Sequence, residues 1–250
     1  MKLFAIGVGE SVRAYQDKLP YIFENYDTIT VHNGLLKLYE HYGLFPTYYS
    51  WGDPFASLHS MRFLDNLKSP IHTKIFIPDS QYTSYENYRK YHGTTRASAN
   101  WGEYIGLINS LINKGFNITL VPTKTTKIKF PSLEDRFNKK GIWIGTVPYT
   151  GDSAEDRNAL ETKLTGLVLP LAYLLGYTEL KVLGFDCIGG RFYDPIEGVP
   201  QAPFKKEQLK YLLENLQIWN SWKDYHNIDI ISVVEDKYTI NNQVLKYQSI

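Results

Sequence analysis

The sequence of 250 residues contains a single cysteine, Cys187, so no disulfide can form within the chain. Such a cysteine content is typical of proteins from a reducing compartment, and we expect a cytoplasmic location. No apolar run approaches the roughly 20 residues that a membrane-spanning helix needs, so no membrane span is expected. The N-terminal apolar run stops at Gly7, and Glu10 and Arg13 follow, which favours a strand over a signal peptide.

An excess of one charge is also missing, because 27 Lys and Arg offset 26 Asp and Glu to leave a formal net charge of +1. This balance gives no electrostatic reason to expect nucleic acid as a partner. The six histidines include no pair four residues apart, and one cysteine cannot form a thiolate cluster, so no metal site is expected. Aromatic residues are abundant at 15% and leave room for a subunit interface, so an oligomer is an open expectation.

Short apolar runs alternate with longer segments of helical period, which predicts an α/β fold: a Rossmann-like, mostly parallel sheet flanked by helices. The strands are expected at Lys2–Ile6, Thr28–Val31, Thr47–Ser50, Thr73–Ile77, Asn117–Val121, Leu180–Leu183 and Ile228–Ser232, with a shorter one at Ile142–Ile144. The helices are expected at Glu10–Asp17, Gly34–Tyr42, Pro54–Asn66, Trp101–Lys114, Glu161–Leu175 and Lys206–Tyr225. Residues 1–250 are interpreted as a single domain.

Two stretches, residues 123–141 and residues 187–205, fit neither pattern and are expected to be irregular loops. The first is rich in lysine, and the second is rich in glycine and proline. Loops of this length in a compact domain are usually functional lids or disordered segments. The second follows the strand that ends in Gly184-Phe185-Asp186, which suits a lid over a ligand.

Ligands of open parallel sheets bind outside the carboxyl ends of the strands, so the residues that follow each strand are site candidates. The turn with Gly7, Gly9 and Ser11 is the first phosphate candidate, because its backbone N–H groups could point at an anion. Ser11 could equally be an ordinary N-cap. Thr165-Gly166 is the second candidate, with a close helix–sheet contact at Gly166 as the alternative.

Acid–base chemistry has few candidates among the histidines. His32 is the one that follows a predicted strand at its carboxyl end, although a surface histidine beside a helix start is the competing interpretation. Asp186 also lies at a strand end, where it would face Gly7–Ser11 across the carboxyl edge of the sheet.

These residues carry a resemblance to the bacterial sialyltransferases of glycosyltransferase family 42 and to the 6-hydroxymethylpterin diphosphokinase-like proteins. Ile6–Val12 looks like the family's first-strand turn, and Thr47–Pro54 is similar to its third-strand segment. Thr165–Asp186 is the most specific match: it opens with Thr-Gly, runs through Leu-Gly-Tyr and ends in a strand with Gly-x-Asp.

The resemblance implies a nucleotide site, a cytidine monophosphate-sugar donor, a glycan acceptor and no required metal. Its implied site residues are Gly7, Gly9, Ser11, Asn33, Asp53, Thr165, Gly166, Gly184 and Asp186. The chain departs from the family at Val8 and Glu10, where asparagine and proline are usual. It also has no histidine between His92 and His226, where the sialyltransferases carry their catalytic histidine.

Three functions therefore stay open. The first is a glycosyltransferase, for which Asp186, Asp194 or His32 would take the proton of the acceptor. The second is a pterin-type diphosphokinase, in which Asp53 would hold Mg²⁺ against phosphates. The third is a non-catalytic nucleotide-binding protein of the same fold.

Overall fold

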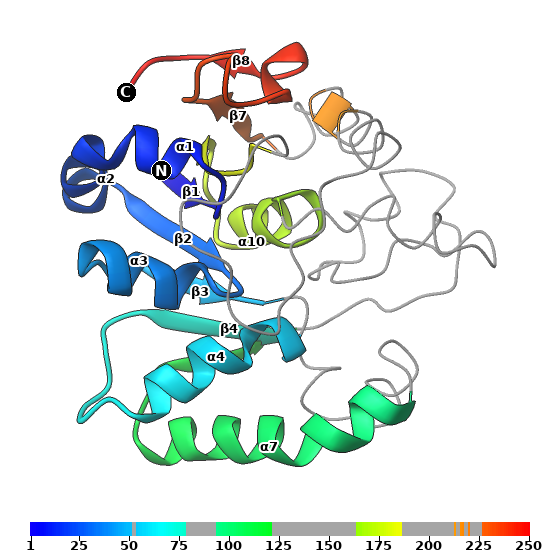
Figure 1. Ribbon diagram of the computed structural model, residues 1–250. Helices are drawn as coiled ribbons and strands as arrows, with labels where there is room; N and C mark the ends of the chain where they lie inside the picture. The colour runs from blue at the N-terminus through cyan, green and yellow to red at the C-terminus, as the bar shows by residue number, and fades with distance from the viewer. Residues whose placement is uncertain are drawn as a thin grey trace.

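The computed structural model describes residues 1–51, 54–78, 94–121, 164–186 and 227–250, together with the single residues 213, 216, 217 and 220. Its strands form one parallel sheet of eight strands, in the order β5-β4-β3-β2-β1-β6-β7-β8 (Figure 1). The strands are β1 Lys2–Ile6, β2 Asp27–Val31, β3 Tyr48–Ser50, β4 Lys74–Pro78, β5 Ile118–Val121, β6 Glu179–Leu183, β7 Asp229–Ser232 and β8 Lys246–Tyr247. The predicted α/β class, with a parallel sheet and flanking helices, is confirmed.

Seven strands were predicted to within one residue at each end. The eighth, β8, was not predicted, because it has two exposed residues and no apolar alternation. The predicted strand at Ile142–Ile144 and both predicted irregular loops lie outside the described residues.

The described helical segments are α1 Ser11–Ala14, η1 Gln16–Lys18, α2 Leu19–Asn25, α3 Gly34–Tyr42, α4 Pro54–Asp65, α7 Thr94–Asn113, η2 Leu164–Val168, α10 Leu169–Leu174 and η3 Asn241–Gln243. The prediction is confirmed at α3 and α4, whereas α7 begins at Thr94 and not at the predicted Trp101, and η3 was not predicted. Most of the helix predicted at Lys206–Tyr225 lies outside the described residues. The single helix predicted at Glu10–Asp17 is wrong, since a short α-helix there gives way to a 3-10 turn and then to the unpredicted α2. The helix before β6 opens with a π-helical turn ahead of Pro170. No described helix is long and apolar enough to cross a membrane.

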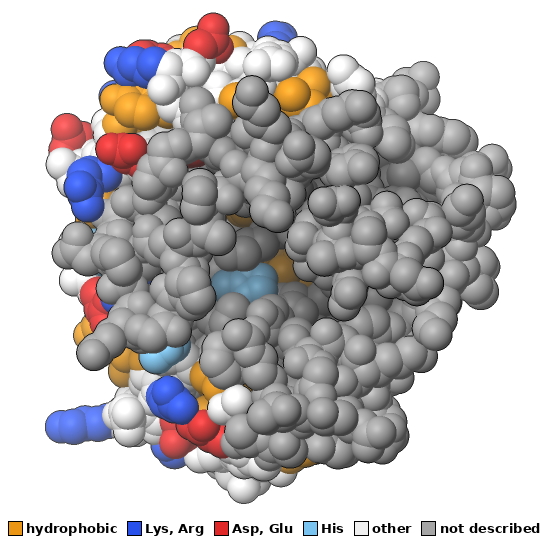
Figure 2. Space-filling model, turned by 45° about the vertical axis from the view of Figure 1, so that its right-hand side comes forward, with side chains coloured by type: hydrophobic (Ala, Val, Ile, Leu, Met, Phe, Trp, Pro, Cys, Tyr) orange, Lys and Arg blue, Asp and Glu red, His pale blue; other side chains and the backbone are white. Residues whose placement is uncertain are grey.

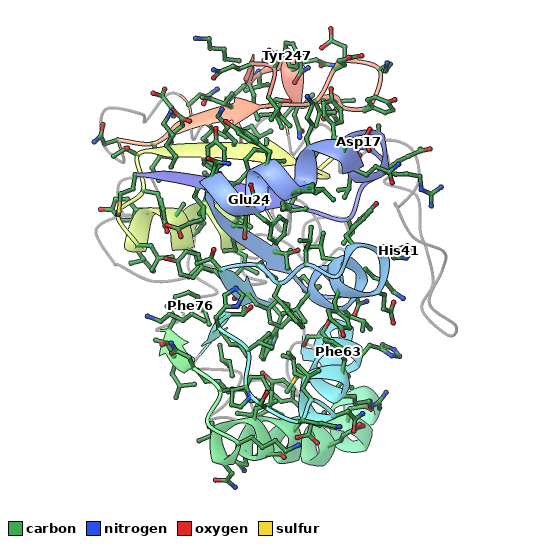
Figure 3. All side chains as sticks on the ribbon, turned by 90° about the vertical axis from the view of Figure 1, so that its left-hand side faces the viewer. Asp17, Glu24, His41, Phe63, Phe76 and Tyr247 are labelled. Carbon is green, nitrogen blue, oxygen red and sulfur yellow. The ribbon has the colours of Figure 1, made fainter. Side chains whose placement is uncertain are left out.

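The two faces of the sheet are covered by different helices. Ile6, Thr30, Tyr49 and Ile75 form one row across β1 to β4, so their side chains share a face. Helices α1, α2, α3, α4 and α7 pack on this face and place their buried residues against it. Figure 3 shows the outer side of these helices, with the exposed side chains of Asp17, Glu24 and His41.

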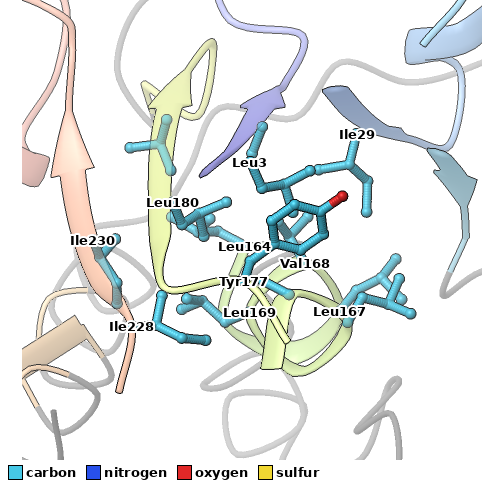
Figure 4. Packing of buried hydrophobic residues seen from close by; sticks show 14 of the residues in the cluster. Leu3, Ile29, Leu164, Leu167, Val168, Leu169, Tyr177, Leu180, Ile228 and Ile230 are labelled. Atoms are coloured by element: carbon cyan, nitrogen blue, oxygen red, sulfur yellow. The ribbon is translucent and has the colours of Figure 1, made fainter. Parts of the chain in front are cut away.

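The opposite face is covered by η2 and α10. Leu3, Ile29 and Leu180 lie on this face and pack against Leu167 and Tyr177 (Figure 4). Leu3 and Leu180 are fully buried, and each such side chain contributes about 2 kcal/mol through removal of apolar surface from water. This packing explains why Thr165–Asp186 shows a helical apolar pattern followed directly by a strand.

The strand order contains a topological switch point. From β1 the chain builds β2 to β5 on one side, and it then returns to add β6, β7 and β8 on the other side. Open α/β sheets bind their ligands in the crevice at such a reversal, outside the carboxyl ends of the strands. The relevant edge is therefore formed by the residues that follow β1, β6 and the neighbouring β2.

Candidate functional site

The turn after β1 docks directly on the end of β6. The Gly7 N–H donates to the Leu183 carbonyl, and the Gly9 N–H donates to the Gly184 carbonyl, each at 2.7 Å. A Cβ on Gly7 would collide with the Gly184 carbonyl oxygen. Gly184 has φ +75°, and a Cβ there would lie 2.5 Å from a methyl carbon of Val12. The glycines of this edge are therefore required by the contact between two backbones.

The Asp186 carboxylate stabilises the contact between the turn after β1 and the end of β6 through hydrogen bonds. The Ser11 N–H donates to Asp186 Oδ2 at 2.8 Å, and the Ser11 hydroxyl donates to Oδ1 at 2.5 Å. The same hydroxyl oxygen accepts from the Gly184 N–H at 3.0 Å. Asp186 is only 2% exposed. A carboxylate from the end of β6 thus occupies the first turn of α1, where Glu10 provides no side-chain cap.

The predicted proximity of Asp186 to Gly7–Ser11 is confirmed, but the geometry limits the phosphate hypothesis. The N–H groups of Gly7, Gly9 and Ser11 were expected to face an anion, and all three donate to residues at the end of β6. A phosphate could use the Ser11 N–H only by displacing the Asp186 carboxylate. Ser11 is also the first residue of α1 and not its N-cap. Phosphate binding at this turn stays a prediction.

Burial dominates the ionisation of Asp186. Burial, with a smaller contribution from the nearby charge of Glu10, outweighs the lowering effect of the two hydrogen bonds from Ser11 and raises the pKa of Asp186 to about 6. Because both of its oxygens accept hydrogen bonds from Ser11, this carboxylate is engaged in holding the chain together. Its predicted role as a catalytic base stays untested.

The second part of the edge is the turn between β2 and α3. His32 is 6% exposed and adopts a left-handed conformation with φ +53°. Its N–H donates to the Ser50 carbonyl at 3.1 Å. Its own carbonyl accepts from the hydroxyls of Tyr49 at 2.7 Å and Ser60 at 3.0 Å. His32 is thus buried at the carboxyl end of β2, and the competing interpretation of a surface histidine is wrong.

Asn33 follows in the same turn and is 5% exposed. It stands at the N-cap position of α3, but its side chain makes no capping hydrogen bond. No hydrogen-bond partner for its side-chain oxygen is found among the described residues. A buried amide oxygen without a donor costs about 1–3 kcal/mol, which a ligand that supplies a donor would offset.

The remaining predicted residues are not brought into this geometry by the described part of the chain. Asp53 and Asp194 lie outside the described residues, as does the predicted lid at residues 187–205. Thr165 and Gly166 lie in the π-helical turn η2, but the burial of these two residues and the Thr165 side chain are likewise outside the described set. Within the described residues, no group of three or more His, Cys, Asp or Glu could hold a metal ion.

Two residues of the C-terminal segment reach this edge without having been predicted. The Asn241 side-chain amide donates to the Phe185 carbonyl at 2.8 Å, and the Thr239 hydroxyl donates to the Asp186 carbonyl at 3.4 Å. Both residues are buried. They support the chain directly after β6, and a polar Thr-Ile-Asn-Asn stretch near a terminus carries no signal that would have revealed this role.

A histidine side chain is visible near the middle of the molecule in the view of Figure 2. Searches against protein-family models and against curated proteins find no match to this sequence. Function must therefore be inferred from the chemistry of the edge itself.

The crowding at Gly184 generates a stability prediction. Gly184→Ala should lower the free energy of unfolding by about 3 kcal/mol. The backbone of residue 184 is left-handed, which strains any residue with a Cβ, and the added Cβ would also collide with Val12 and Gly7. Gly43 has φ +68° with open space around it, so Gly43→Ala should cost only about 1 kcal/mol. Urea unfolding of both variants measures the difference, and equal losses would show that the β1–β6 contact is not tight.

The raised pKa of Asp186 predicts a specific dependence of stability on pH. The folded protein holds this proton more tightly than the unfolded chain does, so the contribution is full below about pH 4 and is lost as pH rises through 6. The shift corresponds to about 3 kcal/mol. Asp186→Asn should abolish this contribution, measured as the difference from wild type in urea unfolding between pH 4 and pH 7.

Asp65 supplies a control of opposite sign. Lys114 and Ser110 lower the pKa of Asp65 through hydrogen bonds, so its contribution to stability is present above its unfolded pKa and is lost as pH falls. Asp65→Asn should therefore make the protein less sensitive to acid. If Asp186→Asn behaves in the same direction as Asp65→Asn, the burial of an ionisable Asp186 is refuted.

Proposed function

We propose that this protein is a nucleotide-sugar-dependent glycosyltransferase of the sialyltransferase-like type, with a cytidine monophosphate-sugar as donor. The observation that carries the proposal is the buried side-chain oxygen of Asn33, which has no partner among the described residues and lies at the carboxyl edge of a parallel sheet. The resemblance to glycosyltransferase family 42 supports the same position, since Asn33 matches an asparagine of that family.

The chemistry of the amide suits a cytosine base. The side chain of asparagine offers an acceptor oxygen next to a donor NH₂ group. Cytosine presents a donor in its exocyclic amine beside acceptor atoms, so the two edges are complementary. An apolar pocket alone could not select cytosine over another base. A buried amide oxygen that lacks a hydrogen-bond donor can do so, because a ligand without a donor group would leave this oxygen unpaired.

Transfer requires a base for the acceptor hydroxyl. In the proposed reaction the acceptor oxygen attacks the anomeric carbon of the sugar, the bond to cytidine monophosphate breaks, and the acceptor proton passes to the base. His32 is adjacent to Asn33 and is our candidate for that base. Asp194 is the alternative. Asp186 is a weaker candidate, because its carboxylate already accepts two hydrogen bonds from Ser11.

That engagement of Asp186 also favours a second function, a nucleotide-binding protein without catalysis. The turn after β1 hydrogen-bonds to the residues at the end of β6, including Gly184 and Asp186, so its role is structural. In that case cytidine monophosphate would bind at Asn33, and no sugar would be transferred or hydrolysed. The two functions differ only in turnover, so binding and turnover have to be measured separately.

Calorimetry with cytidine monophosphate tests the shared part of both functions. Asn33→Ala should weaken binding about tenfold, because one hydrogen bond to a buried group is lost. Asn242→Ala is the matched control, because the Asn242 side-chain oxygen also has no partner among the described residues. Asn242 lies in the segment after β7, where its side-chain nitrogen donates to the Val234 carbonyl and to the Asp236 carboxylate. The control should change binding less than twofold.

Incubation with cytidine monophosphate-sugars, followed by release of cytidine monophosphate, then separates enzyme from binding protein. Turnover that His32→Gln removes supports the transferase, whereas binding without turnover supports the second function. If wild-type protein binds no cytidine nucleotide, both are rejected. Binding of ATP with Mg²⁺ alone would point instead to the diphosphokinase chemistry.

A further inference from the structure

The backbone carbonyl of His32 is held by two side-chain hydroxyls from different elements. Tyr49 belongs to β3 and Ser60 to α4, and both residues are fully buried. Their hydroxyls donate to this one oxygen at 2.7 Å and 3.0 Å. Burial raises the pKa of Tyr49, so its hydroxyl stays protonated and remains a donor throughout the physiological pH range. We call Tyr49 and Ser60 the carbonyl clamp.

The setting of His32 differs from that of Asn227, the other described non-glycine residue with a positive φ. Asn227 has φ +52°, is exposed and lies just before the amino end of β7, away from the candidate site. His32 has the same conformation but is buried, at the carboxyl end of β2. Backbone conformations of this kind persist in a protein interior when the surroundings enforce them, and they cluster at functional sites.

We propose that Tyr49 and Ser60 are positioning residues of the nucleotide site, which they hold in register by fixing the His32 carbonyl. This inference rests on the proposed function. The left-handed residue turns the chain sharply, so α3 can begin at Gly34, where a Cβ would collide with the Thr30 hydroxyl. The carbonyl that the clamp holds belongs to the peptide group between His32 and Asn33, so the clamp acts on the backbone next to the Asn33 side chain.

The physical consequence concerns the direction of that peptide group. With one hydroxyl removed, the buried His32 carbonyl loses a donor, and the peptide group can rotate toward another partner. A rotation about ψ of His32 changes the direction in which the chain continues, so it displaces the Asn33 side chain relative to that of His32. A displacement of about 1 Å is enough to weaken a hydrogen bond to a ligand.

Two pairs of variants isolate this effect. Ser60→Ala removes one clamp hydroxyl, and Ser57→Ala removes another buried hydroxyl of the same helix, which contacts the Met61 sulfur. Tyr49→Phe removes the other clamp hydroxyl. Tyr104→Phe is its control, since the Tyr104 hydroxyl is equally buried and accepts from Trp51 Nε1 at 3.0 Å.

All four variants should unfold a few degrees below wild type, because each removes one buried hydrogen-bonding group. Calorimetry should show cytidine monophosphate binding about tenfold weaker in Ser60→Ala and Tyr49→Phe, and changed less than twofold in Ser57→Ala and Tyr104→Phe. A merely structural role would lower the melting temperature without this split in affinity. Equal affinities across the four variants would overturn the inference.

NMR of the ligand-free protein keeps the clamp testable if wild type binds no cytidine monophosphate. In that outcome the proposed nucleotide site fails, while the geometry of the turn can still be examined. The His32 imidazole signals and the Asn33 side-chain amide signals should shift in Ser60→Ala and Tyr49→Phe, and should stay in place in the two controls. Unchanged signals in the clamp variants would refute positioning by these hydroxyls.

Discussion

The junction between the carboxyl ends of β1 and β6 is the constraint on which the rest of the structure depends. The described sheet has two parts, β1–β5 and β6–β8, and these meet only along the β1–β6 ladder. Beyond that ladder the backbones approach so closely that side chains are excluded at Gly7 and Gly184. The Asp186 carboxylate then bonds to Ser11, so the two parts are joined by main-chain and side-chain hydrogen bonds at the point where the topology reverses.

This junction determines which chemistry is left for a ligand. A buried carboxylate at the start of α1 takes the N–H group that an anion would otherwise use, and its charge repels phosphate in a medium of low dielectric constant. The polar groups of the neighbouring turn differ, because the Asn33 oxygen is buried without a donor among the described residues. The proposed recognition of a base at the end of β2 therefore agrees better with the geometry than phosphate binding at the end of β1, which stays a prediction.

Apolar periodicity was sufficient to predict the sheet, because seven of its strands are short apolar runs that alternate with longer segments of helical period. It could not predict α2, a short helix with Pro20 in its first turn, or β8, whose two residues are exposed. The proximity of Asp186 to the first turn followed from the rule that parallel strands end at one edge. The hydrogen bonds from the Gly7–Ser11 turn to Asp186 could not be predicted, since a glycine-rich turn has the same sequence whether it binds a phosphate or a carboxylate. The hydroxyls that hold His32 gave no signal at all, because buried serine and tyrosine are ordinary in helices and strands.

The central place of β1 has a consequence for how the chain assembles. β1 pairs on one edge with β2, which is the next strand in the chain, and on the other edge with β6. The second edge can be paired only after β6 has been synthesised, since Ser11 is separated from Asp186 by 175 positions. At ordinary rates of synthesis that interval lasts on the order of ten seconds or more. During that time the apolar stretch Leu3–Ile6 offers an unpaired strand edge, which is a template for association with other chains. Closing so long a loop is also slow, so the yield of folded protein depends on how well this first strand is shielded until the last third of the chain has been made.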